Sequence, residues 1–430
     1  MSGPVELAGA APQPDTDGIP RISVLVPAWN AEATLERAIR SVLDESTVSL
    51  ECIVIDDGST DGSSAVIERL RAEDPRVVPV MSSTNLGVSD ALNLGLDAVR
   101  GAWVTFLGAD DRLLPGGLRV MHDAARRDDA LVVVGQRIWS DGRRRWVSSL
   151  YDIPDIRQPG RKSLAVAPGL VYYASATGKL FHRSVTTGLR YYGRVLGDQP
   201  WAIRAMLRAG DRLVVIGDTV YEWARLPSDD ESGSITTTTR SSAERGLEAV
   251  AVAEDAFRDV RDEAYRLLPP ARAEVVAARY AERLLRSDLG MHLRYAVHRG
   301  DTGLSSLFGA IGRFVGSVPP EALAASDALA HDIVERPLRR WARVPREARP
   351  AYWSLLGAAL TADPDLPRRE RDPLARLALV ILGRGPDGPR RVLATGLLRG
   401  SSAVRTVRQR FGRLVPHATA AAARSGISSA

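Results

Sequence analysis

Short apolar runs alternate with amphipathic stretches over the first third of the chain. Residues 22–26 form an aliphatic run, and over residues 35–43 the apolar positions fall three and four apart, which is typical of a helix with one buried face. The cycle repeats, with strands expected at residues 52–55, 77–80 and 103–107 and helices at 62–72, 88–99 and after Pro115. This alternation predicts an α/β fold, a mostly parallel sheet with helices on both faces.

Local signals predict where several elements end. Pro27 is expected to end the first strand and Asn30 to cap the next helix, because proline has no N–H for the ladder and asparagine is a favoured N-cap. Residues 132–139 and 144–150 flank a Ser-Asp-Gly-Arg sequence that indicates a hairpin. Two further strands are expected at residues 212–216 and 220–223, on either side of a Gly-Asp pair.

The pattern changes near residue 240. Residues 226–240 are polar, rich in Ser and Thr, and without periodicity, so we expect a mobile loop there. Beyond it, Ala, Leu and Arg recur at helical spacing with almost no strand signal, which predicts an all-α C-terminal domain. The expected organisation is a disordered lead over residues 1–20, an α/β domain over 21–240, a helical domain over 241–387 and a basic tail over 388–430.

Composition excludes several classes of protein. The chain has 430 residues, is 45% hydrophobic and 25% charged, and so is long enough for two or three folded units rather than a disordered chain. Its single cysteine, Cys52, excludes a disulfide scaffold and a cysteine-cluster metal site. Residues 1–20 lack the basic start and apolar run of a signal peptide, so none is expected, and no apolar run reaches the length of about 18–20 residues that could span a membrane. We therefore expect a cytoplasmic protein, or one peripheral on the inner face of the membrane.

The net charge of +5 is unevenly distributed. Residues 1–240 hold 27 basic and 31 acidic side chains, whereas the tail after Asp387 holds eight arginines and no acidic residue. Residues 404–415 place apolar side chains on one helical face with arginines flanking it. Such a helix could dock on the helical domain, pack in a homo-oligomer, or lie on an anionic membrane surface. A nucleic-acid partner is not expected, because no binding motif accompanies the arginines and no aromatic residues are interleaved with them.

Carboxylates follow several of the predicted strands. Asp56 and Asp57 come directly after one strand, Asp110 and Asp111 after another, and Asp198 lies further along the chain. Adjacent carboxylates at a strand end are hard oxygen ligands suited to Mg²⁺ or Mn²⁺, although each pair alone could equally form a turn or a helix cap. A dinucleotide oxidoreductase and a P-loop NTPase both lose support, since there is no G-x-G-x-x-G after the first strand and no glycine-rich P-loop before Lys179.

Six segments in order over about 95 residues carry a family resemblance. They are VLVPAWN at 24–30, IVIDDGSTD at 53–61, NLGVS at 85–89, NLG at 93–95, GAWVTFL at 101–107 and ADDRLLP at 109–115. Together they resemble the motif series of glycosyltransferase family 2, inverting enzymes with the GT-A fold. Later segments, GKLF at 178–181 and GDQPW at 197–201, resemble members that build bacterial cell-surface glycopolymers, such as teichoic acid glycosyltransferases. The resemblance covers residues 21–240 only.

The resemblance implies a site for a nucleotide-sugar, with a UDP-linked sugar as the family default. Pro27, Ala28 and Asp56 would line the pocket for the base, with Asp57 and Asn85 nearby. Asp57 and the following Gly58 and Ser59 could instead belong to a turn. Asn93 is expected to support a loop rather than to touch ligand. Residues 232–236 resemble the loop that closes over the donor in relatives.

The family's D-x-D motif is altered in this chain. Gly108 occupies the place of the first aspartate, which leaves Asp110 as the expected main ligand of Mn²⁺ or Mg²⁺ and of the diphosphate, with Asp111 assisting. Leu92 is a second departure, because many relatives carry arginine there. The loss at Gly108 motivates an alternative: a non-catalytic nucleotide-sugar-binding or assembly subunit.

Asp198 is the expected catalytic base. An inverting transfer requires the acceptor hydroxyl to lose a proton on the face opposite the leaving diphosphate, and a carboxylate is suited to accept it. The alternative is that Asp198 only caps the helix over 199–208. Lys179 could contact a phosphate of donor or acceptor, or be a surface lysine, and Arg225 is a weaker candidate for the same side. The predicted reaction moves a sugar to a hydroxyl of a cell-surface glycopolymer or lipid-linked precursor.

Overall fold

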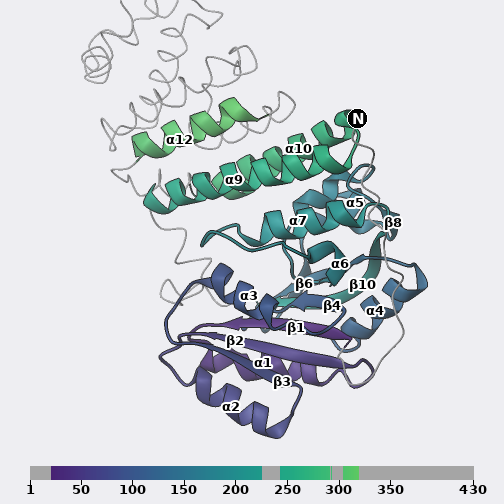
Figure 1. The fold of residues 1–430 in the computed structure, drawn as a ribbon, viewed down its shortest axis with the longest axis vertical. Coiled ribbons are helices and arrows are strands. Elements are labelled where there is room, and N and C mark those ends of the chain that lie inside the picture. Colours follow the sequence, from purple (N-terminus) through teal and green to yellow (C-terminus); the bar gives the residue numbers. More distant parts are fainter. Residues whose placement is uncertain (1–20, 225–242, 291, 293–303, 319–430) are drawn as a thin grey trace, which may run out of the picture. The chain divides into compact units, whose positions relative to one another are not determined.

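One mixed sheet forms the centre of the N-terminal part of the chain. The computed structural model describes residues 21–224, 243–290, 292 and 304–318. Four parallel strands lie in the order β3-β2-β1-β4. Their bounds are Val77–Ser82 for β3, Leu50–Asp57 for β2, Ile22–Ala28 for β1 and Trp103–Phe106 for β4. The predicted α/β fold is therefore confirmed (Figure 1).

The second half of the sheet mixes directions. Next to β4 lies the antiparallel strand β9 (Lys179–His182), followed by β6 (Val132–Ser140) and β10 (Leu213–Ala224), which run parallel to each other. Three short strands complete it: β5 (Arg112–Leu113), β7 (Arg145–Val147) and β8 (Gly160–Lys162).

Helices cover both faces of the sheet. One face carries α1 (Glu32–Leu43), α2 (Ser63–Glu73) and α4 (Gly117–Arg127), whose apolar residues share one buried cluster with Val24, Val26 and Val54. The strand residues next to these valines point to the opposite face of the sheet. That face carries α3 (Val88–Asp97) and α7 (Asp198–Ala209) (Figure 1). Shorter turns lie between β7 and β10: η1 (Ser149–Asp152), α5 (Pro154–Arg157), η2 (Pro168–Tyr173) and α6 (Arg183–Thr186).

Two of the predicted element boundaries were wrong. β1 continues through Pro27 to Ala28. Its pairing with β4 ends at Leu25, so at Pro27 the strand pairs with β2 alone and can include a proline. Asn30 does not cap α1; it has φ 49° and its Oδ1 accepts from the N–H of Thr60 at 2.8 Å. Ala31 is the N-cap, and it has no side-chain oxygen.

The predicted hairpin is confirmed, but one pair of predicted strands is not separate. β6 and β7 pair antiparallel around the Ser-Asp-Gly-Arg turn, with the N–H of Asp141 donating to the carbonyl of Arg144 at 3.2 Å. The strands expected at 212–216 and 220–223 form one strand, β10, whose register against β6 shifts between Val215 and Tyr221. The Gly-Asp pair is therefore a bulge, which bends a strand without ending it.

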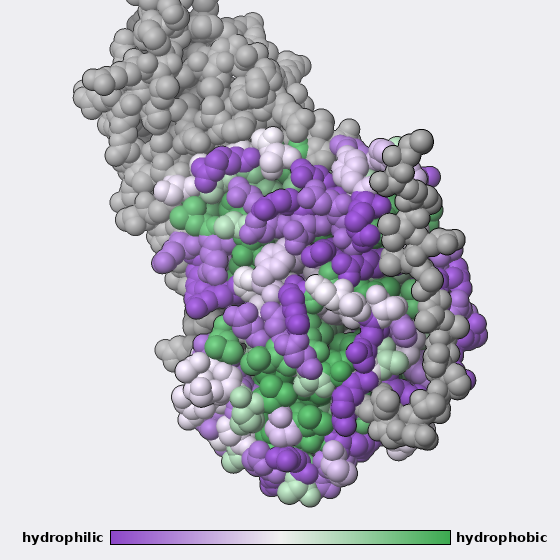
Figure 2. All heavy atoms as spheres, in the orientation of Figure 1, coloured by the Kyte–Doolittle hydropathy of each residue, from purple (hydrophilic) through white to green (hydrophobic). Residues whose placement is uncertain are grey.

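β3 is an edge strand of the sheet. Only β2 pairs with it, most of its residues are half-buried, and the side chain of Met81 is 48% exposed. Figure 2 shows hydrophobic residues gathered over β1–β3 on the face in view, with hydrophilic residues around them. Pro79 is tolerated here because an edge strand has an unpaired side, and its missing N–H weakens the edge as a template for another strand.

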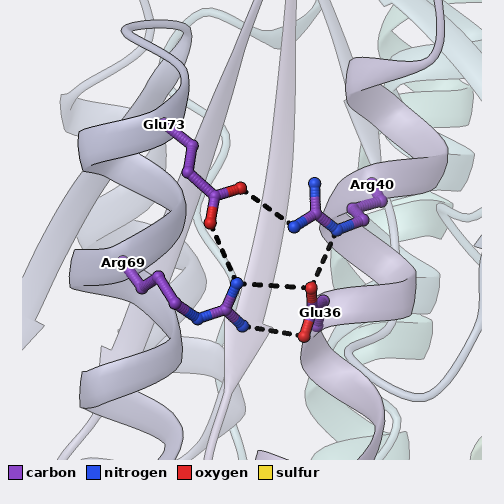
Figure 3. A network of polar contacts seen from close by, with 4 residues as sticks. All are labelled: Glu36, Arg40, Arg69 and Glu73. Atoms are coloured by element: carbon purple, nitrogen blue, oxygen red, sulfur yellow. Dashed lines mark hydrogen bonds and ion pairs between the residues drawn. The ribbon is translucent and has the colours of Figure 1, made fainter.

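Helices α1 and α2 are joined by four charged side chains, Glu36 and Arg40 on α1 and Arg69 and Glu73 on α2 (Figure 3). Arg69 Nη2 contacts Glu36 Oε2 at 2.7 Å, and Arg40 Nη2 contacts Glu73 Oε2 at 2.9 Å. Hydrogen bonds from the guanidinium groups lower the pKa of both glutamates. The four side chains are exposed, so water and salt screen the network and it makes a small contribution to stability.

The chain divides into two compact units, residues 1–232 with 258–276 and residues 233–257 with 277–430. Helix α9 (Ala243–Leu267) contributes to both, as does α10 (Pro270–Arg283). In the first unit Glu263 of α9 accepts from Arg208 Nε of α7 at 2.6 Å. In the second, Phe257 packs edge-on against Phe314 of α12 (Leu304–Ser317), and a π-helical turn, η3 (Leu284–Leu289), follows α10.

Every described element after β10 is helical, as the sequence predicted. Within the described residues, no helix is both long enough and apolar enough to cross a membrane. The expected disordered lead, the loop at 226–240, the closing loop at 232–236 and the tail at 388–430 lie outside the described residues. The domain boundaries remain predictions.

Gly95 allows α3 to lie close to the sheet, and we expect Gly95→Ala to destabilise the protein. A Cβ at this position would lie 2.8 Å from Ile55 Cδ1 and 3.0 Å from Leu25 Cδ2. Overpacking of this kind costs about 1–3 kcal/mol, which exceeds the gain of about 1 kcal/mol in helix propensity. Urea unfolding would measure the change, with Leu94→Ala, 37% exposed on the same helix, as the control. A more stable Gly95→Ala protein would show that α3 has room to move.

Candidate functional site

The loops after β1 and β2 hold each other in place. The N–H of Ala31 donates to Ser63 Oγ at 2.9 Å, and the N–H of Glu32 donates to Asp61 Oδ2 at 3.1 Å. In return the N–H of Gly62 donates to Glu32 Oε2 at 3.0 Å. The first N–H groups of α1 are thus satisfied by side chains of the neighbouring loop rather than by a cap of its own. The strand ends that would line a nucleotide pocket are therefore held in one arrangement.

The structure brings the predicted donor-binding residues together at this edge. Ala28 lies opposite Asp56 in the ladder, and Pro27 lies opposite Ile55. The Asp56 carboxylate is buried and accepts from the N–H of Ser59 at 3.0 Å and from Ser64 Oγ. Each carboxylate oxygen has two lone pairs, so Asp56 retains acceptor capacity.

Asp57 supports the next loop. Its Oδ1 accepts from the N–H of Leu86 at 2.7 Å and its Oδ2 from the N–H of Gly87 at 2.9 Å. Asn85, one residue earlier, is exposed at the same edge. Gly58 has φ 68°, and a Cβ on it would lie 2.7 Å from the nitrogen of Asn85. Asp57 and Gly58 therefore fix the loop that presents Asn85.

The segment after β4 folds its two aspartates around Gly108. Asp111 is buried; its Oδ2 accepts from the hydroxyl of Tyr221 at 2.5 Å and its Oδ1 from the N–H of Ala224 at 2.8 Å. The Tyr221 oxygen in turn accepts from the N–H of Gly108 at 3.1 Å. A Cβ on Gly108 would lie 2.6 Å from Asp111 Oδ2 and 3.0 Å from Asp110 Oδ1. An aspartate at position 108 would therefore not fit this arrangement unless Asp111 moved.

Burial raises the pKa of both of these carboxyls. Burial raises the pKa of Asp111 to about 7, with the neighbouring Asp110 adding to the effect and Tyr221 opposing it. Burial also raises the pKa of Asp110, against the charge of Arg37. Two adjacent carboxylates whose charged forms are disfavoured in this way are suited to a cation, which would favour the ionised form of both.

The carboxylates of Asp110 and Asp111 fit Mn²⁺ or Mg²⁺ if phosphate oxygens and water supply most of the other ligands of the ion. No group of three or more His, Cys, Asp or Glu side chains in the described residues has a metal-binding arrangement. Such ions need only one or two carboxylates when water and phosphate oxygens complete the shell. Asp110 suits this role, because no described side chain donates to its carboxylate, whereas both oxygens of Asp111 already accept hydrogen bonds.

Asp198 is linked to the end of β4 by aromatic packing. It is the first residue of α7, whose N-cap is Gly197, so the alternative in which Asp198 is the N-cap is wrong. Trp201, one turn later, packs edge-on against Phe106 of β4 at 5.0 Å and stacks on Tyr191 at 5.2 Å. The charge of Asp198 contributes to raising the pKa of Tyr191. Because Phe106 directly precedes the loop that carries Asp110, α7 is anchored beside that loop.

Asn93 has the supporting role that the sequence predicted. Its Nδ2 donates to the carbonyl of Tyr191 and its Oδ1 accepts from the N–H of Tyr191, both at 2.9 Å. This pair of hydrogen bonds fixes the segment between α6 and α7 against α3.

Lys179 lies in the protein interior. Its side chain is fully buried in β9, and its Nζ donates to the carbonyl of Ser175 at 2.5 Å and lies 3.4 Å from the centre of the Tyr173 ring. The alternative of a surface lysine is therefore wrong. A phosphate contact from Lys179 remains a prediction, and it would require these interactions to be exchanged. Arg225 lies outside the described residues.

Two residues near Asp111 were not among the residues singled out from the sequence. Tyr221 is described above, and Arg137 is 5% exposed with its guanidinium between the rings of Tyr173 and Trp223, at 4.4 and 4.6 Å from their centres. Burial raises the pKa of Asp111, and the charge of Arg137 is one of the smaller effects that oppose this rise. A single arginine within an otherwise largely apolar strand was a signal for Arg137, whereas nothing local distinguished Tyr221.

Comparison with known proteins gives the family of this site. Residues 23–189 match the family model for glycosyl transferase family 2. These residues form a family 2 glycosyltransferase domain. All six motif segments lie within it, so the matched span holds every predicted site residue except Asp198 and Arg225.

The relatives of the family 2 domain match only part of their length. An uncharacterised glycosyltransferase of Haemophilus influenzae is 42% identical over 93 residues, which cover 22% of this chain and 37% of that protein. A Campylobacter jejuni protein named GalNAc(5)-diNAcBac-PP-undecaprenol beta-1,3-glucosyltransferase is 36% identical over 115 residues, 26% of this chain and 37% of that protein. The chain thus spans little more than a third of the length of these relatives.

A solved structure supports the fold beyond the family 2 domain. TarS of S. aureus, determined in complex with UDP-GlcNAc, superposes with a TM-score of 0.58 at 19% identity, covering 78% of this chain and 90% of that chain. At this identity the similarity bears on the fold alone, and it confirms the predicted GT-A type of α/β fold followed by a helical region.

We expect Tyr221→Phe to destabilise the protein. The change leaves the N–H of Gly108 and a buried oxygen of Asp111 without a partner, at a cost of about 1–3 kcal/mol. Thermal unfolding would measure the effect. Tyr265→Phe is the matched control, because it removes a hydroxyl that is bonded to Glu274 at a 43% exposed residue. Equal melting temperatures for the two variants would contradict the role assigned to Tyr221.

Proposed function

We propose that the protein is a metal-dependent inverting glycosyltransferase. It transfers a sugar from a nucleotide-sugar, UDP-linked by family default, to a hydroxyl of a cell-surface glycopolymer or lipid-linked precursor. The observation that carries the proposal is the placement, in a family 2 domain, of Asp56 and Asp57 at the carboxyl end of β2 and of the Asp110–Asp111 pair after β4, the two parallel strands on either side of β1. Open α/β sheets bind their ligands at this edge.

The donor base is assigned to the carboxyl ends of β1 and β2. Pro27 and Ala28 would lie beside the base, and Asp56 would offer its remaining acceptor capacity to an N–H at the edge of the base. Asn85 is exposed on the loop between β3 and α3. Asp57 holds that loop, because its two oxygens accept the main-chain N–H groups of Leu86 and Gly87.

The diphosphate is assigned to the Asp110 side. Asp110 would hold Mn²⁺ or Mg²⁺ together with phosphate oxygens, with Asp111 assisting through its charge; when bound, the cation stabilises negative charge on the leaving diphosphate. Gly108 does not exclude this role, since it makes room for the two carboxylates that remain.

Asp198 is assigned as the general base. Asp198 lies in the first turn of α7. The edge-on contact between Trp201 and Phe106 holds this turn beside β4. A carboxylate there would take the proton of the acceptor hydroxyl as that oxygen attacks the anomeric carbon and the bond to the diphosphate breaks. The acceptor class has support from the Campylobacter relative, which is named for an undecaprenol-linked substrate.

A second candidate is a non-catalytic nucleotide-sugar-binding or assembly subunit, and Gly108 in place of a carboxylate favours it. The two candidates differ in one observable. An enzyme hydrolyses its donor slowly in the presence of Mn²⁺ and releases nucleoside diphosphate, whereas a binder returns the donor unchanged. Membrane attachment and oligomer formation through the tail remain predictions that the described residues do not address.

Asp198→Asn is expected to lower the transfer rate about 10²–10⁴-fold while donor binding survives. The amide keeps the size of the side chain but cannot accept the proton. Coupled release of nucleoside diphosphate, measured with a panel of nucleotide-sugars and acceptors, gives the rate, and calorimetry gives donor affinity. Asp123→Asn, at a 58% exposed carboxylate of α4, is the control. Unchanged transfer by Asp198→Asn would remove this residue from the mechanism.

Metal removal is expected to weaken donor binding. Calorimetric titration of UDP should show a higher affinity with Mn²⁺ than with EDTA, because Asp110 would hold the cation together with phosphate oxygens of the ligand. Asp110→Asn should abolish the difference, whereas Asp90→Asn, at an exposed residue of α3, should preserve it. An Asp110→Asn protein with full metal dependence would place the ion elsewhere.

A further inference from the structure

A hollow of about 560 Å³ in the first unit is lined almost entirely by polar side chains. Four of its lining residues are arginines that come from α1, β5, the β6–β7 turn and β7, and one is a carboxylate. They are Arg37, Arg112, Arg143, Arg145 and Glu222. Ser140 and Gly142 are the other described residues of the lining. None of these residues belongs to the donor site described above.

The positive charge in the hollow is only partly compensated. Glu222, whose side chain is 12% exposed, contacts Arg112 Nη2 at 3.0 Å and Arg145 Nε at 2.9 Å. No described carboxylate forms an ion pair with Arg37 or Arg143. Four guanidinium groups therefore face one carboxylate, which leaves three positive charges.

One donor in the hollow is also unsatisfied. Arg112 Nε is buried and has no hydrogen-bond partner among the described residues, although its Nη2 is bonded to Glu222. A buried unpaired donor and clustered like charges both carry a free-energy cost, and one bound anion would relieve both. Guanidinium groups are planar forks that match the oxygens of phosphate.

The hollow adjoins the aspartate loop. Arg112 directly follows Asp111, and Arg37 Nη2 donates to the main-chain carbonyl of Asp110 at 2.5 Å. A group bound here would therefore lie beside the loop that carries Asp110 and Asp111. We propose that this arginine hollow binds a phosphate group of the acceptor, separately from the donor diphosphate. The assignment to the acceptor rests on the proposed function, whereas the anion site itself does not.

The test uses the full chain and two probes, inorganic phosphate for a free anion and dimethyl phosphate for a phosphate inside a chain. Binding is followed by ³¹P NMR titration with Mg²⁺ and saturating UDP. Both probes should bind while UDP is bound. The double variant Arg143→Gln/Arg145→Gln should lose about tenfold or more in affinity for both probes, since charge-assisted hydrogen bonds to the anion are removed.

The control removes the same charge elsewhere. Arg71→Gln/Arg119→Gln changes two exposed arginines of α2 and α4 outside the hollow and should bind both probes like the parent protein. An equal loss in the two double variants, competition by UDP, or binding of inorganic phosphate without dimethyl phosphate would each overturn the proposal. Failure of UDP itself to bind, with phosphate binding intact in the hollow, would instead count against the proposed function alone. A melting temperature close to that of the parent confirms that each variant is folded.

Discussion

The hydroxyl of Tyr221 holds the two halves of the sheet together at the candidate site. It donates to Asp111 and accepts from the N–H of Gly108, and so it connects β10 to the loop that follows β4. The parallel strands carry the proposed donor site and the mixed strands border the proposed acceptor site, so this one oxygen lies where the two halves of the sheet meet. Its burial raises the pKa of Tyr221 well above the ordinary value, which keeps the hydroxyl protonated and able to donate.

The α/β alternation over the first 130 residues was predictable because each buried strand and each one-sided helix leaves a periodic trace. What local pattern could not predict was how a boundary responds to its neighbours. Pro27 remains in β1 because only β2 pairs with the strand there, and Asn30 bonds to the next loop instead of capping its own helix. The bulge in β10 similarly depends on its pairing with β6.

The candidate site was predictable where a motif supplied the residues and less so where burial decided their state. The grouping of Asp56, Asp57 and Asn85 at one edge followed from parallel strand ends. The sequence could not reveal that Lys179 is interior, nor that Asp111 depends on a tyrosine 110 residues later. Both facts arise from packing between segments far apart in the chain, to which a local pattern is blind.

The burial of Lys179 also has a practical consequence for chemistry on the protein's surface. The chain contains two lysines, and only Lys162, half-buried on β8, offers its side chain to solvent. Reagents selective for lysine side chains should therefore couple at Lys162 alone. This residue lies on β8, opposite Leu213 of β10, and not in the loop that carries Asp110 and Asp111. A fluorophore or surface tether could be attached there without engineering a new residue.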